Sequence, residues 1–182
     1  ILGGQVIAMD GKILRRSHDR GIGQAAIDMV SAWACANRLV LGQVKVDDKS
    51  NEITAIPALL QVLEVAGCIV TIDAMGCQTE IAATIIDKQA DYVLALKDNQ
   101  SRLFEDVQLL FADLEKSQYK AYAFDYAKTL DKNHGRLEIR EGWTISDPEI
   151  LCHLRGFENW KNLCTISRIR APRHVGAEKS CE

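Results

Sequence analysis

The stretch CIVTIDAMGCQTEIAATIIDKQADYVLALK, residues 68–97, decides the fold class. Residues 68–73 and 92–97 are continuous apolar runs that each end in a charged residue, which predicts strands buried on both faces. Between them, residues 80–89 carry isoleucines at helical spacing. A strand, a helix and a second strand in this order predict a βαβ unit with two parallel strands.

Upstream of this unit, three short apolar segments predict strands at residues 5–10, 26–36 and 38–46. The first is expected to close on the turn signal Asp10-Gly11, and the short polar joins favour an antiparallel meander. Ser50 is expected to cap a helix that ends near Gly67.

Downstream of the unit, Asn99 is expected to cap a long helix with an apolar stripe from Leu103 to Leu114. The order is therefore three strands, helix, strand, helix, strand, helix. It predicts an α/β fold, a mixed sheet with flanking helices in which the central strand pairs with the fourth, as in ribonuclease-H-like folds. After residue 120, the alternating segments 121–126 and 136–140 flank an Asn/Gly-containing turn and predict a β-hairpin.

Bulk properties indicate a globular domain. The chain has 182 residues, 47% of them hydrophobic, and no apolar run approaches the roughly 18 residues of a membrane span. No signal peptide is expected, and the absence of an initial Met suggests N-terminal truncation. The six cysteines form no CxxC pair, which argues against structural zinc and favours a reducing, cytoplasmic location.

The net charge of −3 hides an uneven distribution. Residues 10–20 hold four basic against two acidic side chains, and residues 155–179 hold six against two. Such segments favour DNA contact, although solvated protein surfaces often show the same asymmetry.

Asp10 and Asp73 each end an apolar strand, where a charge is costly unless something outside the strand uses it. The carboxyl ends of strands in α/β sheets are where ligands bind. If the two strands are neighbours, both carboxylates can reach one Mg²⁺ or Mn²⁺ ion. The alternative reading is that both aspartates are ordinary turn residues.

Six segments in order carry a family resemblance: VIAMDGKILRR around Asp10, VSAWA at 30–34, QVKVDDKSNEI at 43–53, TIDAMGCQ at 71–78, YVLALK at 92–97 and HGRLE at 134–138. Together they resemble the H-repeat-associated branch of the bacterial insertion-sequence DDE transposases. The resemblance covers about residues 5–170.

This resemblance implies metal-dependent DNA cleavage and strand transfer by a D-D-E triad, with Mg²⁺ or Mn²⁺ as cofactor. It assigns Asp10 and Asp73 as the first and second catalytic, metal-binding carboxylates. The third, a glutamate, is expected beyond residue 170, so the fragment is expected to be inactive alone. Glu138 is the alternative third ligand.

The resemblance also divides the chain into a ribonuclease-H-like catalytic core, residues 1–120, truncated at both ends, and a β-rich insertion after the fifth strand with a basic tail, residues 121–182. The implied partners are DNA, as element ends and target, and no membrane; a homodimer and nucleoid association are also expected. The candidate DNA-binding residues are Lys12, Arg15, Arg16, Lys97, Asn99, His134, Arg136 and Arg140. For the hairpin residues, the alternative is a solvated strand.

Three residues depart from the family pattern: Ile13 stands in place of threonine, Asp28 in place of histidine and Asp98 in place of glycine. These departures fit a decaying element, so a catalytically dead DNA-binding or assembly remnant is the alternative function. A receiver-type phosphoacceptor domain, with Asp73 as acceptor and Lys97 as partner, is disfavoured by the antiparallel opening and by the lack of an acidic pair after the first strand.

Overall fold

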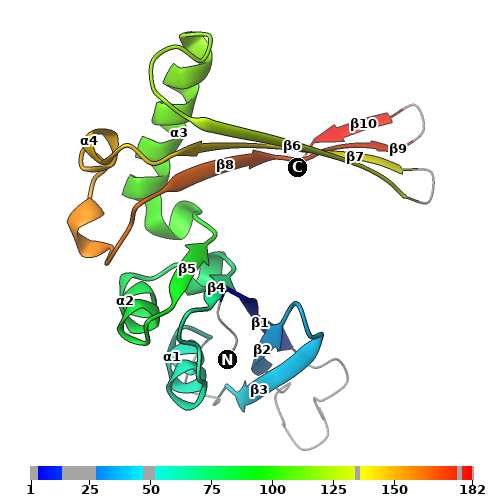
Figure 1. The fold of residues 1–182 in the computed structure, drawn as a ribbon, viewed down its shortest axis with the longest axis vertical. Coiled ribbons are helices and arrows are strands. Elements are labelled where there is room, and N and C mark those ends of the chain that lie inside the picture. Colours follow the sequence, from blue (N-terminus) through cyan, green and yellow to red (C-terminus); the bar gives the residue numbers. More distant parts are fainter. Residues whose placement is uncertain (1–3, 14–27, 47–51, 134–135, 176–177, 182) are drawn as a thin grey trace, which may run out of the picture. The chain divides into compact units, whose positions relative to one another are not determined.

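The computed structural model describes residues 4–13, 28–46, 52–133, 136–175 and 178–181. The chain divides into two compact units (Figure 1). The first unit comprises residues 1–101 and 159–162, and the second comprises residues 102–158 and 163–182.

The first unit contains a five-stranded mixed sheet in the order β3-β2-β1-β4-β5. Its strands are β1 (Val6–Ile13), β2 (Asp28–Ala34), β3 (Leu39–Lys45), β4 (Ile69–Ile72) and β5 (Asp91–Leu94). The strands β1, β2 and β3 form an antiparallel meander, whereas β1, β4 and β5 run parallel. The predicted mixed α/β sheet, in which the central strand (here β1) pairs with the fourth, is confirmed.

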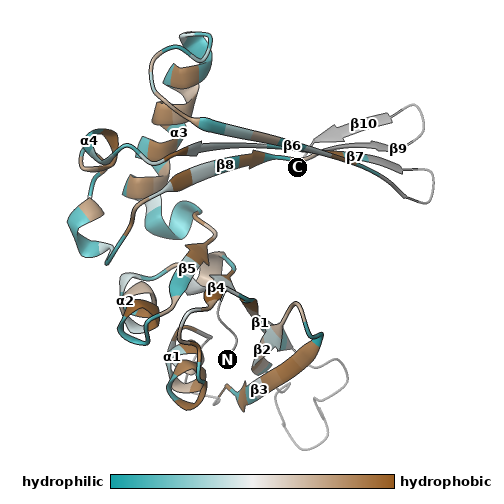
Figure 2. Cartoon of the chain, in the orientation of Figure 1, coloured by the Kyte–Doolittle hydropathy of each residue, from teal (hydrophilic) through white to brown (hydrophobic). Residues whose placement is uncertain are grey.

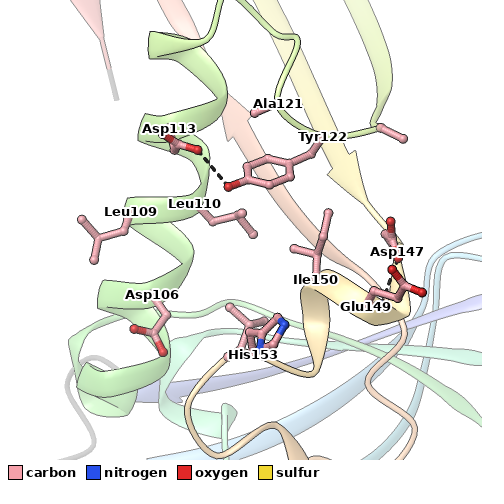
Figure 3. A pocket seen from close by; sticks show the side chains of 12 residues that line it. Asp106, Leu109, Leu110, Asp113, Ala121, Tyr122, Asp147, Glu149, Ile150 and His153 are labelled. Atoms are coloured by element: carbon pink, nitrogen blue, oxygen red, sulfur yellow. Dashed lines mark hydrogen bonds between the residues drawn. The ribbon is translucent and has the colours of Figure 1, made fainter.

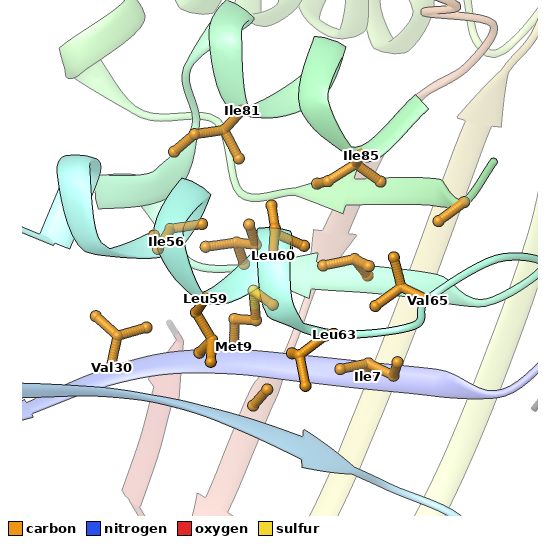
Figure 4. Packing of buried hydrophobic residues seen from close by; sticks show 14 of the residues in the cluster. Ile7, Met9, Val30, Ile56, Leu59, Leu60, Leu63, Val65, Ile81 and Ile85 are labelled. Carbon is orange, nitrogen blue, oxygen red and sulfur yellow. The ribbon is translucent and has the colours of Figure 1, made fainter. Parts of the chain in front are cut away.

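Two helices, α1 (Glu52–Val62) and α2 (Thr79–Asp87), supply much of the core of this unit. Leu59 and Leu60 of α1 and Ile85 of α2 are fully buried, together with Ile7 of β1. Figure 4 shows these apolar side chains gathered between the helices and one face of the sheet. Burial of this kind is the dominant stabilising term in a domain of this size.

Three details of the predicted strands are wrong. First, β1 does not close at Asp10-Gly11 but continues to Ile13, because β2 extends the ladder to the pair of Ile13 with Asp28. Second, β4 is not buried on both faces, since its residues alternate between buried and partly exposed. Third, β5 is an edge strand, and Val93 is 60% exposed.

The second unit combines two helices with an antiparallel sheet in the order β10-β9-β7-β6, with β8 paired to β7. Its elements are α3 (Ser101–Lys116), whose first residue belongs to the first unit, β6 (Asp125–Asn133), β7 (Arg136–Ile145), α4 (Pro148–Leu151), β8 (Ile166–Arg170), β9 (Pro172–Val175) and β10 (Glu178–Cys181). A hairpin is present as predicted, formed by β6 and β7. Its first strand was placed wrongly, because β6 runs from Asp125 to Asn133 and not over residues 121–126. The basic tail contains the strands β9 and β10, which pair with each other in antiparallel orientation.

Apart from its first residue, the helix α3 belongs to the second unit. Its hydrophobic and hydrophilic residues alternate in the helical pattern visible in Figure 2. Phe111 and Leu114 are buried, and the Arg168 guanidinium lies 5.1 Å from the centre of the Phe111 ring and 4.8 Å from that of Trp143. These contacts explain why α3 belongs with the antiparallel sheet.

Among the described helices, none combines the length and the apolar character that a membrane span requires. Cys35, Cys77, Cys152 and Cys164 are free thiols.

Candidate metal and DNA site

The register between β1 and β4 places two aspartates at the same level of the sheet. The strands are parallel, and Met9 lies opposite Ile72. The next residue is an aspartate in both cases: Asp10 within β1, and Asp73 directly after the end of β4. Both aspartates are exposed while Met9 and Ile72 are buried, so Asp10 lies on the sheet face opposite the core and Asp73 is exposed at the end of the neighbouring strand.

A row of polar side chains continues from Asp10 across the same face. Asp10 pairs with Ser31 of β2, and Ser31 pairs with Gln43 of β3. Directly opposed residues in a sheet point to the same side. The Gln43 Nε2 group donates a hydrogen bond to Ser31 Oγ at 3.0 Å. Ser31 and Gln43 were missed from the sequence, because only the strand register brings them beside Asp10.

Two lysines lie one side-chain row further along. Lys12 pairs with Met29, and Met29 pairs with Lys45. Both lysines are exposed and share the face of Asp10, because residues two apart along a strand point to the same side. The predicted DNA-contact residue Lys12 is therefore near the aspartate pair, while Arg15 and Arg16 lie outside the described residues.

The segment after β4 turns sharply at Asp73. The Asp73 carboxylate caps a short 3₁₀ helix (Ala74–Gly76), with its Oδ1 accepting a hydrogen bond from the Met75 N–H at 3.1 Å. Gly76 is buried, and a Cβ there would come within 2.2 Å of Ile72 Cγ2. Only glycine therefore fits at this position of the turn. The same turn supplies the N–H group that holds the Asp73 carboxylate.

Two amide side chains after β5 bind this turn. The Asn99 Nδ2 group donates to the Ala74 carbonyl at 2.7 Å, and Gln100 Nε2 donates to the Cys77 carbonyl at 2.9 Å. The expectation that Asn99 caps the long helix is wrong: Asn99 lies in a 3₁₀ turn (Asp98–Gln100), and its amide donates to the turn after β4 instead. Lys97 is exposed just before that turn.

The other candidate DNA-binding residues lie in the second unit. Arg140 is ion-paired with Asp131 at 3.1 Å and with Glu138 at 2.6 Å. His134 lies outside the described residues, and only the backbone of Arg136 is described. The charge of Arg140 is thus already compensated within the hairpin, as is that of the alternative third ligand, Glu138.

Further basic residues of the second unit are also paired. Arg155 contacts Asp106 at 2.7 Å and Glu105 at 3.0 Å, and its guanidinium lowers the pKa of the Asp106 carboxyl. Arg168 and Arg170 both contact Glu115. The basic segment recognised in the sequence therefore serves in part to hold the second unit together.

An open concavity of about 710 Å³ lies between α3 and α4 in the second unit (Figure 3). Its lining includes four carboxylates, of which those of Asp106, Asp113 and Asp147 have internal partners. Asp113 accepts a hydrogen bond from Tyr122 at 2.8 Å, and Asp147 accepts one from the Glu149 N–H at 2.9 Å. This surface is therefore a weaker candidate for chemistry than the aspartate pair.

Within the described part of the chain, no three or more His, Cys, Asp or Glu side chains gather as a metal site would require. The aspartate pair supplies hard oxygen donors only. Cys77, next to the turn, is buried, and this burial raises the pKa of its thiol to about 11. The available donors suit Mg²⁺ or Mn²⁺ rather than a thiophilic ion.

Comparison with known proteins decides the family. Residues 2–145 match the family described as the transposase DDE domain. The chain belongs to this family. It is 41% identical to the "H repeat-associated putative transposase YhhI" of Escherichia coli K12, over 97% of the chain and 46% of the relative. The predicted resemblance to H-repeat-associated DDE transposases is therefore confirmed.

Other relatives are similar over the whole chain. The transposase domain is 43% identical to "Putative transposase YncI" of Escherichia coli O157:H7, over 100% of the chain and 45% of the relative. It is 39% identical to an uncharacterised protein of Xanthobacter autotrophicus, over 100% of the chain and 60% of the relative. The chain thus spans about half the length of the curated relatives it matches.

Among solved structures, the transposase domain aligns with a chain of the piggyBac transposase synaptic complex with hairpin DNA. The TM-score is 0.40 at 8% identity, over 76% of this chain and 30% of that chain.

Proposed function

We propose that this chain is part of the catalytic domain of an insertion-sequence transposase that cleaves and joins DNA with Mg²⁺ or Mn²⁺. Its DNA partners would be the element ends and the target. The observation that supports this most is the pair of aspartates, Asp10 and Asp73, at one level of adjacent parallel strands. We also propose that the sheet is the ribonuclease-H-like core and that the β6–β10 region is its insertion.

The spacing of the strands favours a shared ion. Neighbouring strands lie about 4.8 Å apart, a separation that lets two aspartate side chains on one face converge on a single cation. One oxygen of Asp73 is already fixed by the Met75 N–H. A carboxylate held in this way is oriented before any ion arrives, which reduces the ordering cost of binding.

The surrounding residues suit a DNA phosphate. Asp10 and Asp73 would hold the ion, and the ammonium groups of Lys12 and Lys45 would attract the phosphate backbone along the same face. Ser31 can donate its hydroxyl hydrogen to a phosphate oxygen while its own oxygen accepts from Gln43. The chemistry that divalent ions supply at such a site is charge stabilisation during in-line displacement at phosphorus.

We further propose that residues 1–182 alone do not complete catalysis. A two-metal site needs more oxygen ligands than two aspartates provide. No third carboxylate gathers with Asp10 and Asp73 among the residues that the structure describes. With two ligands, binding of Mn²⁺ is expected near about 1 mM, the weak end of carboxylate sites.

Metal binding tests the site directly. Titration of the chain with Mn²⁺, followed by water proton relaxation, should show binding that is lost in Asp10→Ala and in Asp73→Ala. The matched control is Asp91→Ala, an exposed aspartate at the start of β5, paired with Ile69 at the other end of β4. Equal binding by wild type and Asp73→Ala would overturn the site.

A plasmid-nicking assay in Mn²⁺ tests the completeness of the ligand set. Neither the wild-type chain nor Asp73→Ala is expected to nick DNA, whereas a longer protein that supplies the third carboxylate should do so. If residues 1–182 nick DNA and Asp73→Ala does not, the proposal that this chain lacks the third metal ligand would be refuted. Glu138 would then be the first residue to test as that ligand.

A further inference from the structure

The peptide group between Ala74 and Met75 is engaged at both ends. Its carbonyl oxygen accepts a hydrogen bond from Asn99 Nδ2 at 2.7 Å. Its N–H, which belongs to Met75, donates to Asp73 Oδ1 at 3.1 Å. Because a peptide group is planar and rigid, fixing its carbonyl also fixes the direction of its N–H. Asn99 is thus connected to the Asp73 carboxylate through one rigid group.

The two hydrogen bonds also reinforce each other. Donation to the carbonyl oxygen polarises the peptide group, which makes its N–H a better donor to a carboxylate. The Asn99–Ala74 bond is the shorter of the two and joins residues far apart in the sequence. Through this bond, Asn99 in the segment after β5 helps to fix the orientation of Asp73, which follows β4.

We propose that Asn99 is a positioning residue for Asp73, holding this carboxylate in its ligating orientation through the Ala74–Met75 peptide group. The proposal rests on the proposed function, since it assumes that Asp73 binds a divalent ion. It assigns Asn99 a role that differs from helix capping and from contact with DNA phosphate.

The neighbouring Gln100 provides an internal comparison. Its amide also donates to the turn, but to the Cys77 carbonyl at 2.9 Å and to Gln78 Oε1 at 3.2 Å. These acceptors lie at the far end of the turn, and neither belongs to the peptide group that contacts Asp73. A role limited to supporting the turn would make the two amides equivalent, whereas positioning makes Asn99 the more important for metal binding.

Three variants of the chain separate these roles: Asn99→Ala, Asn99→Asp and Gln100→Ala. We expect Asn99→Ala to weaken Mn²⁺ binding about 3- to 10-fold, somewhat less than loss of a group bonded directly to a ligand. Asn99→Asp keeps the side-chain shape and adds a negative charge but cannot donate. It should also weaken binding, although charge attraction alone would strengthen it. Gln100→Ala should weaken it less than Asn99→Ala.

Amide hydrogen exchange measured by NMR supplies a readout without metal. Exchange of the Met75 amide should accelerate about 5-fold in Asn99→Ala, as expected for a loosened hydrogen bond. Gln100→Ala should instead affect the far end of the turn, at Cys77 and Gln78. Absence of Mn²⁺ binding by the wild type would overturn the proposed metal site. The Met75 exchange rate would still show whether Asn99 stabilises the hydrogen bond from the Met75 N–H to Asp73. An unchanged Met75 exchange rate in Asn99→Ala, or tighter Mn²⁺ binding by Asn99→Asp, would overturn the positioning role.

Discussion

At the scale of single residues, Cys77 is the thiol nearest in sequence to Asp73, and its burial disfavours the metal-binding thiolate form. Its side chain is 3% exposed, and burial raises the pKa of its thiol to about 11 by disfavouring the thiolate. The thiolate is the form that binds metals and reacts with electrophiles. At neutral pH Cys77 is therefore protonated and inert.

This state of Cys77 can be measured by alkylation. With iodoacetamide at about pH 8, the exposed Cys35 should react at least about 10-fold faster than Cys77 in the folded chain. Denaturation in urea should remove the difference, because the unfolded chain exposes both thiols. Mass spectrometry of the digested products gives both rates. Equal rates in the folded chain would show that the turn opens freely.

At the scale of elements, the 3₁₀ turn after Asp73 depends on close packing at Gly76. An added Cβ would lie 2.2 Å from Ile72 Cγ2 and 3.0 Å from Ile56 Cδ1, so β4 or α1 would have to move. Both neighbours are buried core residues with little freedom to shift. The turn is thus coupled to the core that supports the sheet.

Gly76→Ala should therefore destabilise the protein by about 1–3 kcal/mol, the usual cost of overpacking. Gly142→Ala is the matched control, because a Cβ at Gly142 of β7 meets nothing within 4 Å. That control should change the free energy of unfolding by less than about 0.5 kcal/mol. Urea denaturation followed by circular dichroism gives both values. Similar stabilities for the two variants would contradict the packing at Gly76.

The sequence predicted the strands of the sheet because each is a short apolar segment bounded by polar residues, as is the run from Cys68 to Asp73. It placed the end of β1 wrongly because Asp10-Gly11 is a turn signal locally, whereas pairing with β2 continues past it. Strand propensities of this kind are routinely overridden by tertiary pairing. The edge position of β5 could not be predicted either, because the order of strands in a sheet does not follow from the residues of any one strand.

The candidate site was predicted in its two carboxylates but not in their surroundings. Asp10 and Asp73 could be found because each follows an apolar run. Ser31 and Gln43 could not, because a polar residue in a strand is ordinary until the register places it beside an aspartate. Asn99 was expected to cap the helix because asparagine often accepts hydrogen bonds from the backbone N–H groups that follow it. Its amide instead donates to the Ala74 carbonyl, which is distant in the sequence.

At the scale of the whole molecule, the net charge of −3 makes strong DNA binding unexpected. Many of the basic side chains of the second unit are paired, as Arg155 is with Asp106 and Arg140 with Glu138. Among the described residues, neither Lys12 nor Lys45 has an ion-pair partner. These two lysines are therefore the better candidates for phosphate contact.

We expect weak DNA binding, independent of sequence, that falls as salt rises, because phosphate contact releases counterions. The double variant Lys12→Ala, Lys45→Ala should weaken it and reduce the slope of log affinity against log salt by about 2. The control is Lys116→Ala, an exposed lysine at the end of α3. Fluorescence anisotropy at several salt concentrations measures both. Affinity that does not change with salt would contradict phosphate contact on this face.

The pairing of β1 with β4 also governs when the aspartate pair can exist. The two strands lie far apart in the chain, with β2, β3 and α1 between them. Closing so long a loop lowers the chain entropy before the contacts between β1 and β4 stabilise the fold, and such non-local pairing slows folding. Because β4 leaves the ribosome well after β1, a nascent chain that has completed only its meander carries Asp10 without Asp73. The two aspartates are thus brought together only once the parallel half of the sheet has been synthesised and has docked.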